Sequence, residues 1–198
     1  MSGTQRRASI LEASTPIFAQ RGFHGTTTRD LRSAAGTTQG AIYVYSHDKR
    51  GLYRAVLEKQ AQEVLAALLD ATKPESRELD ETTWLADLAH RVLARMEADP
   101  IPFRLFLFSA LEQDACSSPL LRLHGVLTRH IESRLACGHG DETERALLAQ
   151  CLVGMVFHFG LLWMLEGKWP CGVAREQIVK TVVRTVLGSA APGTRPRD

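Results

Sequence analysis

Apolar side chains recur at intervals of three and four residues along most of the chain, which is the spacing of one helix face. The first such stretch holds Ile10, Leu11, Ile17 and Phe18 and ends at Gly22, a residue type that commonly follows a helix. No stretch alternates convincingly between apolar and polar residues with the period of two that is typical of strands. The pattern therefore predicts an all-α protein of about nine helices.

Helix caps and helix breakers separate these stretches. Thr27 and Asp30 have the spacing of a capping box, and so have Asp141 and Glu144. Thr38 and Asp48 can each cap the helix that follows, and Pro119 stands at a first helical position. The predicted helices lie at residues 10–21, 28–35, 38–43, 49–71, 84–96, 103–111, 119–135, 142–166 and 174–187.

The second and third predicted helices, with the turn between them, have the layout of a helix-turn-helix. The small residues at 34–36 let the two helices approach closely, while Leu31 and Ile42 face inward. The third helix then presents short or amide-bearing side chains, which let a helix enter the major groove of DNA. Gln39 is the side chain that can pair bidentately with an adenine edge.

The charge distribution is uneven along the chain. Residues 1–54 hold eight Lys and Arg against three Asp and Glu, a net charge of +5, whereas residues 55–198 hold sixteen against nineteen, a net charge of −3. A small basic module attached to an acidic body is suited to a polyanionic partner, and a solvated basic helix would give the same count.

The cysteines form no metal-binding pattern. Cys116, Cys137, Cys151 and Cys171 are scattered, without a CxxC pair or the paired histidine spacing of a zinc site. We therefore expect reduced thiols, no metal and no other cofactor. The first residues include no apolar segment of a secretion signal, so we expect a cytoplasmic protein.

Residues 8–57, and above all the segment GFHGTTTRDLRSAAGTTQGAIYVYSHDKRGLYRAVLE, resemble the N-terminal domain of the TetR family of transcriptional regulators. The shared pattern joins G-F-x-x-T-T, an A-A-G turn, G-x-I-Y-x-Y and D-K-x-x-L. The resemblance implies a regulator, in most cases a repressor, that binds a palindromic operator in double-stranded DNA as a homodimer and is released by a small-molecule effector. It also implies that DNA is approached by Thr27, Thr28, Arg29, Thr37, Thr38, Gln39, Gly40, Ala41, Tyr43, Tyr45, His47 and Lys49.

Three features depart from the family pattern. Ser46 and His47 stand where an aromatic residue and a small residue or proline are usual, which predicts a less tightly packed turn before the fourth helix. Arg32 replaces the usual alanine and adds a candidate phosphate contact. Thr37 stands where a buried valine is usual.

The longest apolar run, residues 146–165, is interrupted only by Gln150 and His158. It is long enough to cross a bilayer, which leaves a membrane-anchored regulator as an alternative. A helix that is apolar all round can also lie inside a soluble protein, covered by its own domain and by a partner subunit. The resemblance favours the second interpretation, since TetR-like proteins pair through their last two helices, here 142–166 and 174–187. We expect no membrane partner.

The region where TetR-like proteins keep a ligand cavity is rich in large or adaptable apolar side chains, which favours an apolar or aromatic effector. His158 stands out there, because an imidazole amid apolar neighbours needs a polar partner. The predicted ligand-binding residues are Met96, Phe103, Phe106, Leu107, Leu127, Met155, His158, Phe159 and Trp163.

Three segments follow from these patterns. We predict a three-helix helix-turn-helix DNA-binding domain at residues 1–50, a helical effector-binding and dimerisation domain at 51–188, and a disordered tail at 189–198. A helical enzyme is the remaining alternative. The chain has no GxGxxG or HExxH sequence and no Ser-His-Asp order, so we expect no catalytic residues and no enzyme.

Overall fold

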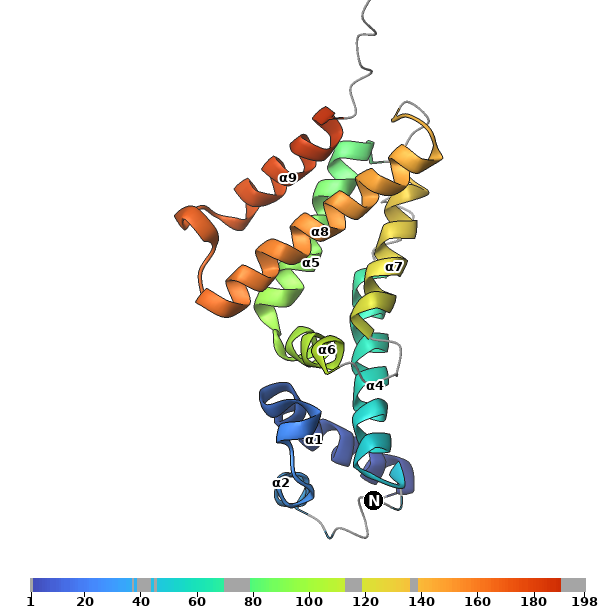
Figure 1. Cartoon of the computed structure of the whole chain (residues 1–198), viewed down its shortest axis with the longest axis vertical. Coiled ribbons are helices and arrows are strands. Elements are labelled where there is room, and N and C mark those ends of the chain that lie inside the picture. The colour runs from blue at the N-terminus through green and yellow to red at the C-terminus, as the bar shows by residue number, and fades with distance from the viewer. Residues whose placement is uncertain are drawn as a thin grey trace, which may run out of the picture. The chain divides into compact units, whose positions relative to one another are not determined.

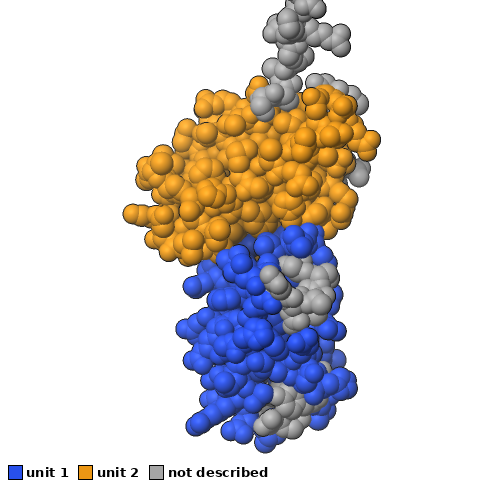
Figure 2. Space-filling view, in the orientation of Figure 1, with its two compact units in different colours: residues 1–66, 100–123 blue, residues 67–99, 124–198 orange. Residues whose placement is uncertain are grey.

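The computed structural model describes residues 2–36, 38, 44, 46–69, 79–112, 119–135 and 139–189, and these residues hold helices and no strand. The predicted all-α fold is confirmed. The chain forms two compact units, one made of residues 1–66 and 100–123 and the other of residues 67–99 and 124–198 (Figure 2). The predicted tail lies outside the described residues from position 190 onward.

The first unit contains α1 (Gly3–Gly25), α2 (Thr28–Ala34), α6 (Ile101–Leu111) and most of α4 (Lys49–Leu69) (Figure 1). Helix α1 packs against both α6 and α2. The apolar faces predicted for these helices meet in one core, whose most deeply buried side chains include Phe18, Leu31, Leu52, Val56, Leu105 and Phe106. Helices α1 and α6 therefore belong to one packing unit, although 76 positions separate the end of α1 from the start of α6.

The start of α4 is a tight turn. Asp48 caps the helix as predicted, because its Oδ1 accepts the backbone N–H of Gly51 at 2.6 Å and its carbonyl accepts that of Leu52. Ser46 is buried, His47 adopts a positive φ of 63°, and a side chain at position 51 would lie 2.0 Å from the Ser46 carbonyl oxygen. The expectation of a loosely packed turn is therefore wrong for the described residues. The close approach is permitted by Gly51, which has no side chain to meet the Ser46 carbonyl oxygen.

The second unit contains α5 (Glu81–Ala98), most of α7 (Pro119–Glu132), α8 (Glu142–Glu166), the short 3-10 helix η2 (Pro170–Gly172) and α9 (Arg175–Ser189). Helix α5 packs against α8 and α9, which also pack against each other (Figure 1). The predicted capping box opens α8, since Asp141 accepts from the Glu144 N–H at 2.9 Å and the Glu144 carboxylate accepts from the Asp141 N–H. Gly167 ends that helix with a left-handed φ of 70°.

Helices α8 and α9 differ in how far their apolar residues are covered. The apolar stripe of α9 is buried within the unit: Ile178, Val179, Val182, Val183 and Val186. In α8, which is long and apolar enough to cross a membrane, only 28% of the most apolar 18-residue window is buried. Leu147 and Leu165 of α8 are among the exposed large apolar residues of the described chain. Helix α8 therefore leaves an apolar face uncovered in the protomer, and α9 does not.

Candidate nucleic-acid interface

The first site of interest is the corner where α1 turns toward α2. Within α1, Gly22 has φ 67° and ψ −175°, so the helix breaks there and one further turn follows. Only glycine adopts this conformation at little cost. The predicted end of the first helix at Gly22 is thus the position of the break. After it, the Thr26 hydroxyl donates to the Gly22 carbonyl oxygen at 2.7 Å, and Thr26 is buried.

A carboxylate from α6 lies inside this corner. Oε1 of Glu112, the residue that ends α6, accepts the backbone N–H of Phe23 at 2.7 Å and that of His24 at 3.3 Å. Its other oxygen, Oε2, accepts the hydroxyl of Tyr53 in α4 at 3.2 Å. A side chain at Gly22 would lie 2.4 Å from Oε1. One carboxylate therefore joins α1, α4 and α6.

Lys49 closes the corner from the other side. Its Nζ donates to the carbonyl oxygens of Phe23 at 2.7 Å and Thr26 at 2.8 Å, and lies 4.2 Å from the centre of the Phe23 ring. Two of its three ammonium protons are thus used inside the unit. The family resemblance placed Lys49 among the residues that approach DNA, whereas in the structure its ammonium group is a contact between α4 and the α1 corner.

Helix α2 begins directly after the corner with the predicted capping box. The Thr27 hydroxyl accepts the Asp30 N–H at 3.2 Å and donates to the Asp30 carboxylate, which also accepts the Thr27 N–H at 2.9 Å. Hydrogen bonds from Thr27 and the charge of Arg21, 3.1 Å away, lower the pKa of Asp30 below its ordinary value. The Thr27 hydroxyl is therefore occupied by the cap, while Arg29 of the same turn is exposed and Thr28 half-buried.

The predicted third helix falls largely outside the described residues. Six of its assigned DNA contacts lie there: Thr37, Gln39, Gly40, Ala41, Tyr43 and Tyr45. Of the positions that the structure describes in this segment, Thr38, Val44 and His47 are exposed, and Val44 is helical. The departure at Arg32 is also on the surface.

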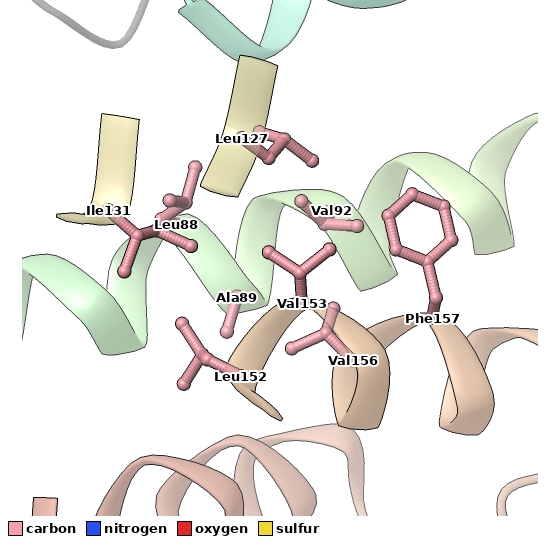
Figure 3. A pocket seen from close by; sticks show the side chains of 9 residues that line it. All are labelled: Leu88, Ala89, Val92, Leu127, Ile131, Leu152, Val153, Val156 and Phe157. Carbon is pink, nitrogen blue, oxygen red and sulfur yellow. The ribbon is translucent and has the colours of Figure 1, made fainter. Parts of the chain in front are cut away.

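A second candidate site is an apolar cavity in the second unit (Figure 3). It is lined from three helices, by Leu88, Ala89 and Val92 of α5, Leu127 and Ile131 of α7, and Leu152, Val153, Val156 and Phe157 of α8. These side chains point into a common space and none of them carries a charge (Figure 3). A lining of this chemistry suits apolar groups and offers no ionic anchor.

The structure brings one of the nine predicted ligand-binding residues, Leu127, to this cavity. Phe103 and Phe106 are buried in the first unit with ring centres 6.2 Å apart, and Leu107 is half-buried beside them in sequence. Met96 packs at Gly160, where a side chain would lie 2.3 Å from its sulfur. The remaining predictions on α8 do not line the cavity: Met155, His158, Phe159 and Trp163.

His158 needs a specific correction. The sequence placed this imidazole among apolar neighbours, where it would require a buried partner. In the structure it lies on the exposed face of α8, near the Phe159 ring at 5.7 Å. Water can satisfy its ring nitrogens in the protomer, so the imidazole is no sign of a ligand.

Comparison with known proteins agrees with this geometry. Residues 10–56 match the family described as "Bacterial regulatory proteins, tetR family". The chain is 24% identical to the uncharacterized HTH-type transcriptional regulator YdgC of Bacillus subtilis (strain 168), over 89% of this chain and 90% of that protein. It is 38% identical to the HTH-type transcriptional repressor AcnR of Corynebacterium glutamicum, over 29% of this chain and 31% of the repressor.

Solved structures show the same fold over the whole chain. A member of the TetR family from Streptomyces coelicolor has a TM-score of 0.71 at 19% identity, covering 95% of this chain and 99% of that one. AibR, solved with isovaleryl coenzyme A and operator DNA, has a TM-score of 0.67 at 17% identity, covering 91% of this chain and 97% of that one. Together with the capped α2 and the corner before it, these similarities define a helix-turn-helix transcriptional regulator. Residues 10–56 belong to the TetR family of bacterial regulatory proteins, and the chain as a whole is similar in fold to solved members of that family.

The contacts of Lys49 lead to a prediction on stability. Replacing Lys49 with alanine removes the donor to two carbonyls, one of them on the buried Thr26, and should lower the free energy of unfolding by about 1–3 kcal/mol. Lys59→Ala is the matched control, because Lys59 makes a surface ion pair with Glu63 that is worth at most about 1 kcal/mol. Urea denaturation of both variants is the measurement, and equal midpoints would contradict the structural role of Lys49.

Proposed function

We propose that the protein is a transcriptional repressor that binds a palindromic operator as a homodimer and dissociates when a small apolar effector binds. The excess of basic residues in positions 1–54 supports attraction to DNA phosphates. The repressor role is supported by AcnR, a repressor that is 38% identical to 29% of this chain. Because such a protein works on the chromosome, we place it in the cytoplasm and assign it no catalytic role.

Within this function, the third helix reads bases and its surroundings hold the phosphates. Gln39 is our choice for base recognition, since a long amide can pair with both adenine N6 and N7 in the major groove. Phosphate contacts are assigned to the exposed Arg29, to Tyr43, Tyr45 and His47, and to the remaining proton of Lys49.

The role of Gln39 predicts a change in sequence preference. Gln39→Ala should cost about 1–3 kcal/mol of binding on the cognate operator and relax the preference at one symmetric base position. Arg29→Ala is the comparison, because loss of a phosphate contact weakens binding evenly across sequences. Both are measured on a randomised operator library. A Gln39 variant with unchanged preference at every base position would refute base reading by this residue.

A second copy of the chain is the partner that best fits the uncovered face of α8. That face carries Leu147, Cys151, Gly154, His158 and Leu165, all exposed in the protomer. Exposed contiguous apolar surface of this kind marks an interface. The contribution of α9 differs from the sequence expectation, because its apolar stripe is buried and its outward residues are Gln177, Lys180, Thr181 and Arg184. We propose an interface with an apolar centre from α8 and a polar border from α9.

A charge placed at the centre of this face should separate the subunits. Gly154 has open space around it, so Gly154→Arg fits the protomer but leaves an unpaired charge in the interface. It should weaken dimerisation by on the order of 100-fold or more. Leu121→Arg, at an exposed position of α7, should leave the dimer intact. Sedimentation at micromolar concentration is the test, and a wild-type monomer would overturn the proposal. A wild-type chain that needs detergent would favour a membrane anchor.

The cavity between α5, α7 and α8 is our proposed effector site. Its lining of aliphatic side chains and one phenyl ring supports an apolar or aromatic ligand.

A cavity-filling substitution tests this site. The neutral apolar fluorophore N-phenyl-1-naphthylamine should bind the wild-type chain with increased fluorescence. Ala89 is buried and lines the cavity, so Ala89→Leu should remove most of that increase by occupying the space. Ala66→Leu places the same group at an exposed position of α4 and should bind the probe like wild type. Equal fluorescence from both variants would show that the probe binds elsewhere.

A further inference from the structure

We propose that Glu112 is a positioning residue for DNA binding: its carboxylate holds the corner between α1 and α2 at the angle that operator recognition requires. The proposal rests on the DNA-binding function and adds to it a residue that lies 56 positions beyond the end of the matched segment 10–56. It is drawn from the contacts of the Glu112 side chain and from the space around Gly22.

The first argument is the number of groups that this one carboxylate satisfies. The break at Gly22 begins a new helical turn, and the first N–H groups of such a turn have no partner within it. Oε1 of Glu112 accepts two of them, from Phe23 and His24, while Oε2 accepts the Tyr53 hydroxyl. Tyr53 is itself buried against Phe18 and Phe23, with ring centres 4.8 Å and 5.4 Å apart. Charge-assisted hydrogen bonds of this kind are the strong ones.

The second argument is that the corner is held from both sides. Phe23 gives its N–H to Glu112 and its carbonyl oxygen to Lys49, so the residue is fixed between α6 and α4. Four residues later Thr27 caps α2, and the Arg21–Asp30 ion pair joins the two sides of the corner. With so few residues in between, a change in the Phe23 position moves the start of α2.

The third argument is steric. A Cβ at position 22 would lie 2.4 Å from Oε1 of Glu112 and 3.2 Å from the Phe108 ring of α6. The carboxylate therefore fills the space that a side chain would take in an ordinary helix. Gly22 and Glu112 fit each other, and the positive φ of Gly22 is the backbone conformation that makes room for the carboxylate.

The direction of the change in DNA affinity distinguishes positioning from a simple charge effect. Removing a negative charge from the basic DNA-binding unit would raise DNA affinity if charge alone mattered. Positioning predicts a lower DNA affinity, because without the carboxylate the corner no longer holds α1 and α2 at a fixed angle. Glu58 provides the control, since this exposed carboxylate of α4 pairs with Arg122 at 3.5 Å and has the same charge as Glu112.

The experiment measures binding of the full-length chain to a labelled duplex selected by the wild-type protein from random DNA, and to a scrambled duplex. Glu112→Ala should weaken binding to the selected duplex by roughly tenfold or more, given the loss of hydrogen bonds to a charged acceptor. Binding to the scrambled duplex should change much less. Glu58→Ala should bind both duplexes like wild type or slightly more tightly.

Two further variants separate positioning from stability. Glu112→Gln keeps an oxygen for the two backbone N–H groups and can donate to the Tyr53 hydroxyl, so it should bind the selected duplex close to wild type. Glu112→Asp keeps the negative charge, but its side chain is one methylene shorter and its carboxylate lies farther from the Phe23 and His24 N–H groups. It should therefore lose affinity for the selected duplex even where Glu112→Ala is too unstable to measure. Urea midpoints confirm that each variant is folded during the binding assay.

The proposal is overturned if folded Glu112→Ala and Glu112→Asp bind the selected duplex like wild type, or if they lose the same factor on both duplexes. A wild-type chain that selects no sequence from random DNA would instead contradict the DNA-binding function itself. The two failures are therefore distinguishable.

Discussion

The DNA-binding unit depends on a broken helix in which side chains bind five of the backbone groups at the break. A helix that ends by breaking leaves N–H groups and carbonyls without intrahelical partners, and such groups are costly to bury. At the α1 corner the N–H groups go to Glu112, the carbonyls of Phe23 and Thr26 go to Lys49, and the Gly22 carbonyl goes to the Thr26 hydroxyl. An anion and a cation, each from a different helix, thus stabilise the same short turn.

Local sequence signals predicted the features that are local in structure. The caps at Thr27, Asp48 and Asp141 could be recognised because a cap and its partner stand three residues apart. Gly22 could be predicted as a break because glycine commonly follows a helix. Glu112 gave no such signal, since 89 residues separate it from Phe23, and the pairing exists only once α6 packs on α1. Lys49 was assigned to DNA because sequence shows that a lysine is near the module but not which way its ammonium points.

The apolar cavity in the second unit shows why large apolar residues are poor guides to empty space. Phe103, Phe106 and Met96 were chosen for their size, yet large side chains are buried because they fill volume and touch many neighbours. The cavity lies instead where aliphatic residues, one alanine and one phenylalanine meet from α5, α7 and α8 (Figure 3). Its position follows from where three helices fail to close completely, which depends on helix packing and is absent from the pattern of one sequence.

The last two helices differ in what covers their apolar residues: those of α9 lie in the core of the second unit, whereas α8 also has an exposed apolar face. Both show apolar spacing in sequence, and that spacing alone indicates a face to be covered without indicating what covers it. In α9 the stripe is narrow and one side of the helix is polar, so α5 and α8 are enough to bury it. In α8 apolar residues lie on all sides of the helix. The other helices of its unit cover only one of these sides. The exposed Leu147 and Leu165 are the consequence. Gly154, which has no side chain, and the polar His158 interrupt the same apolar face. Lipid offers the imidazole no hydrogen-bonding partner, whereas a second helix can bring its own hydrogen-bonding groups. A second helix therefore suits this surface better than lipid.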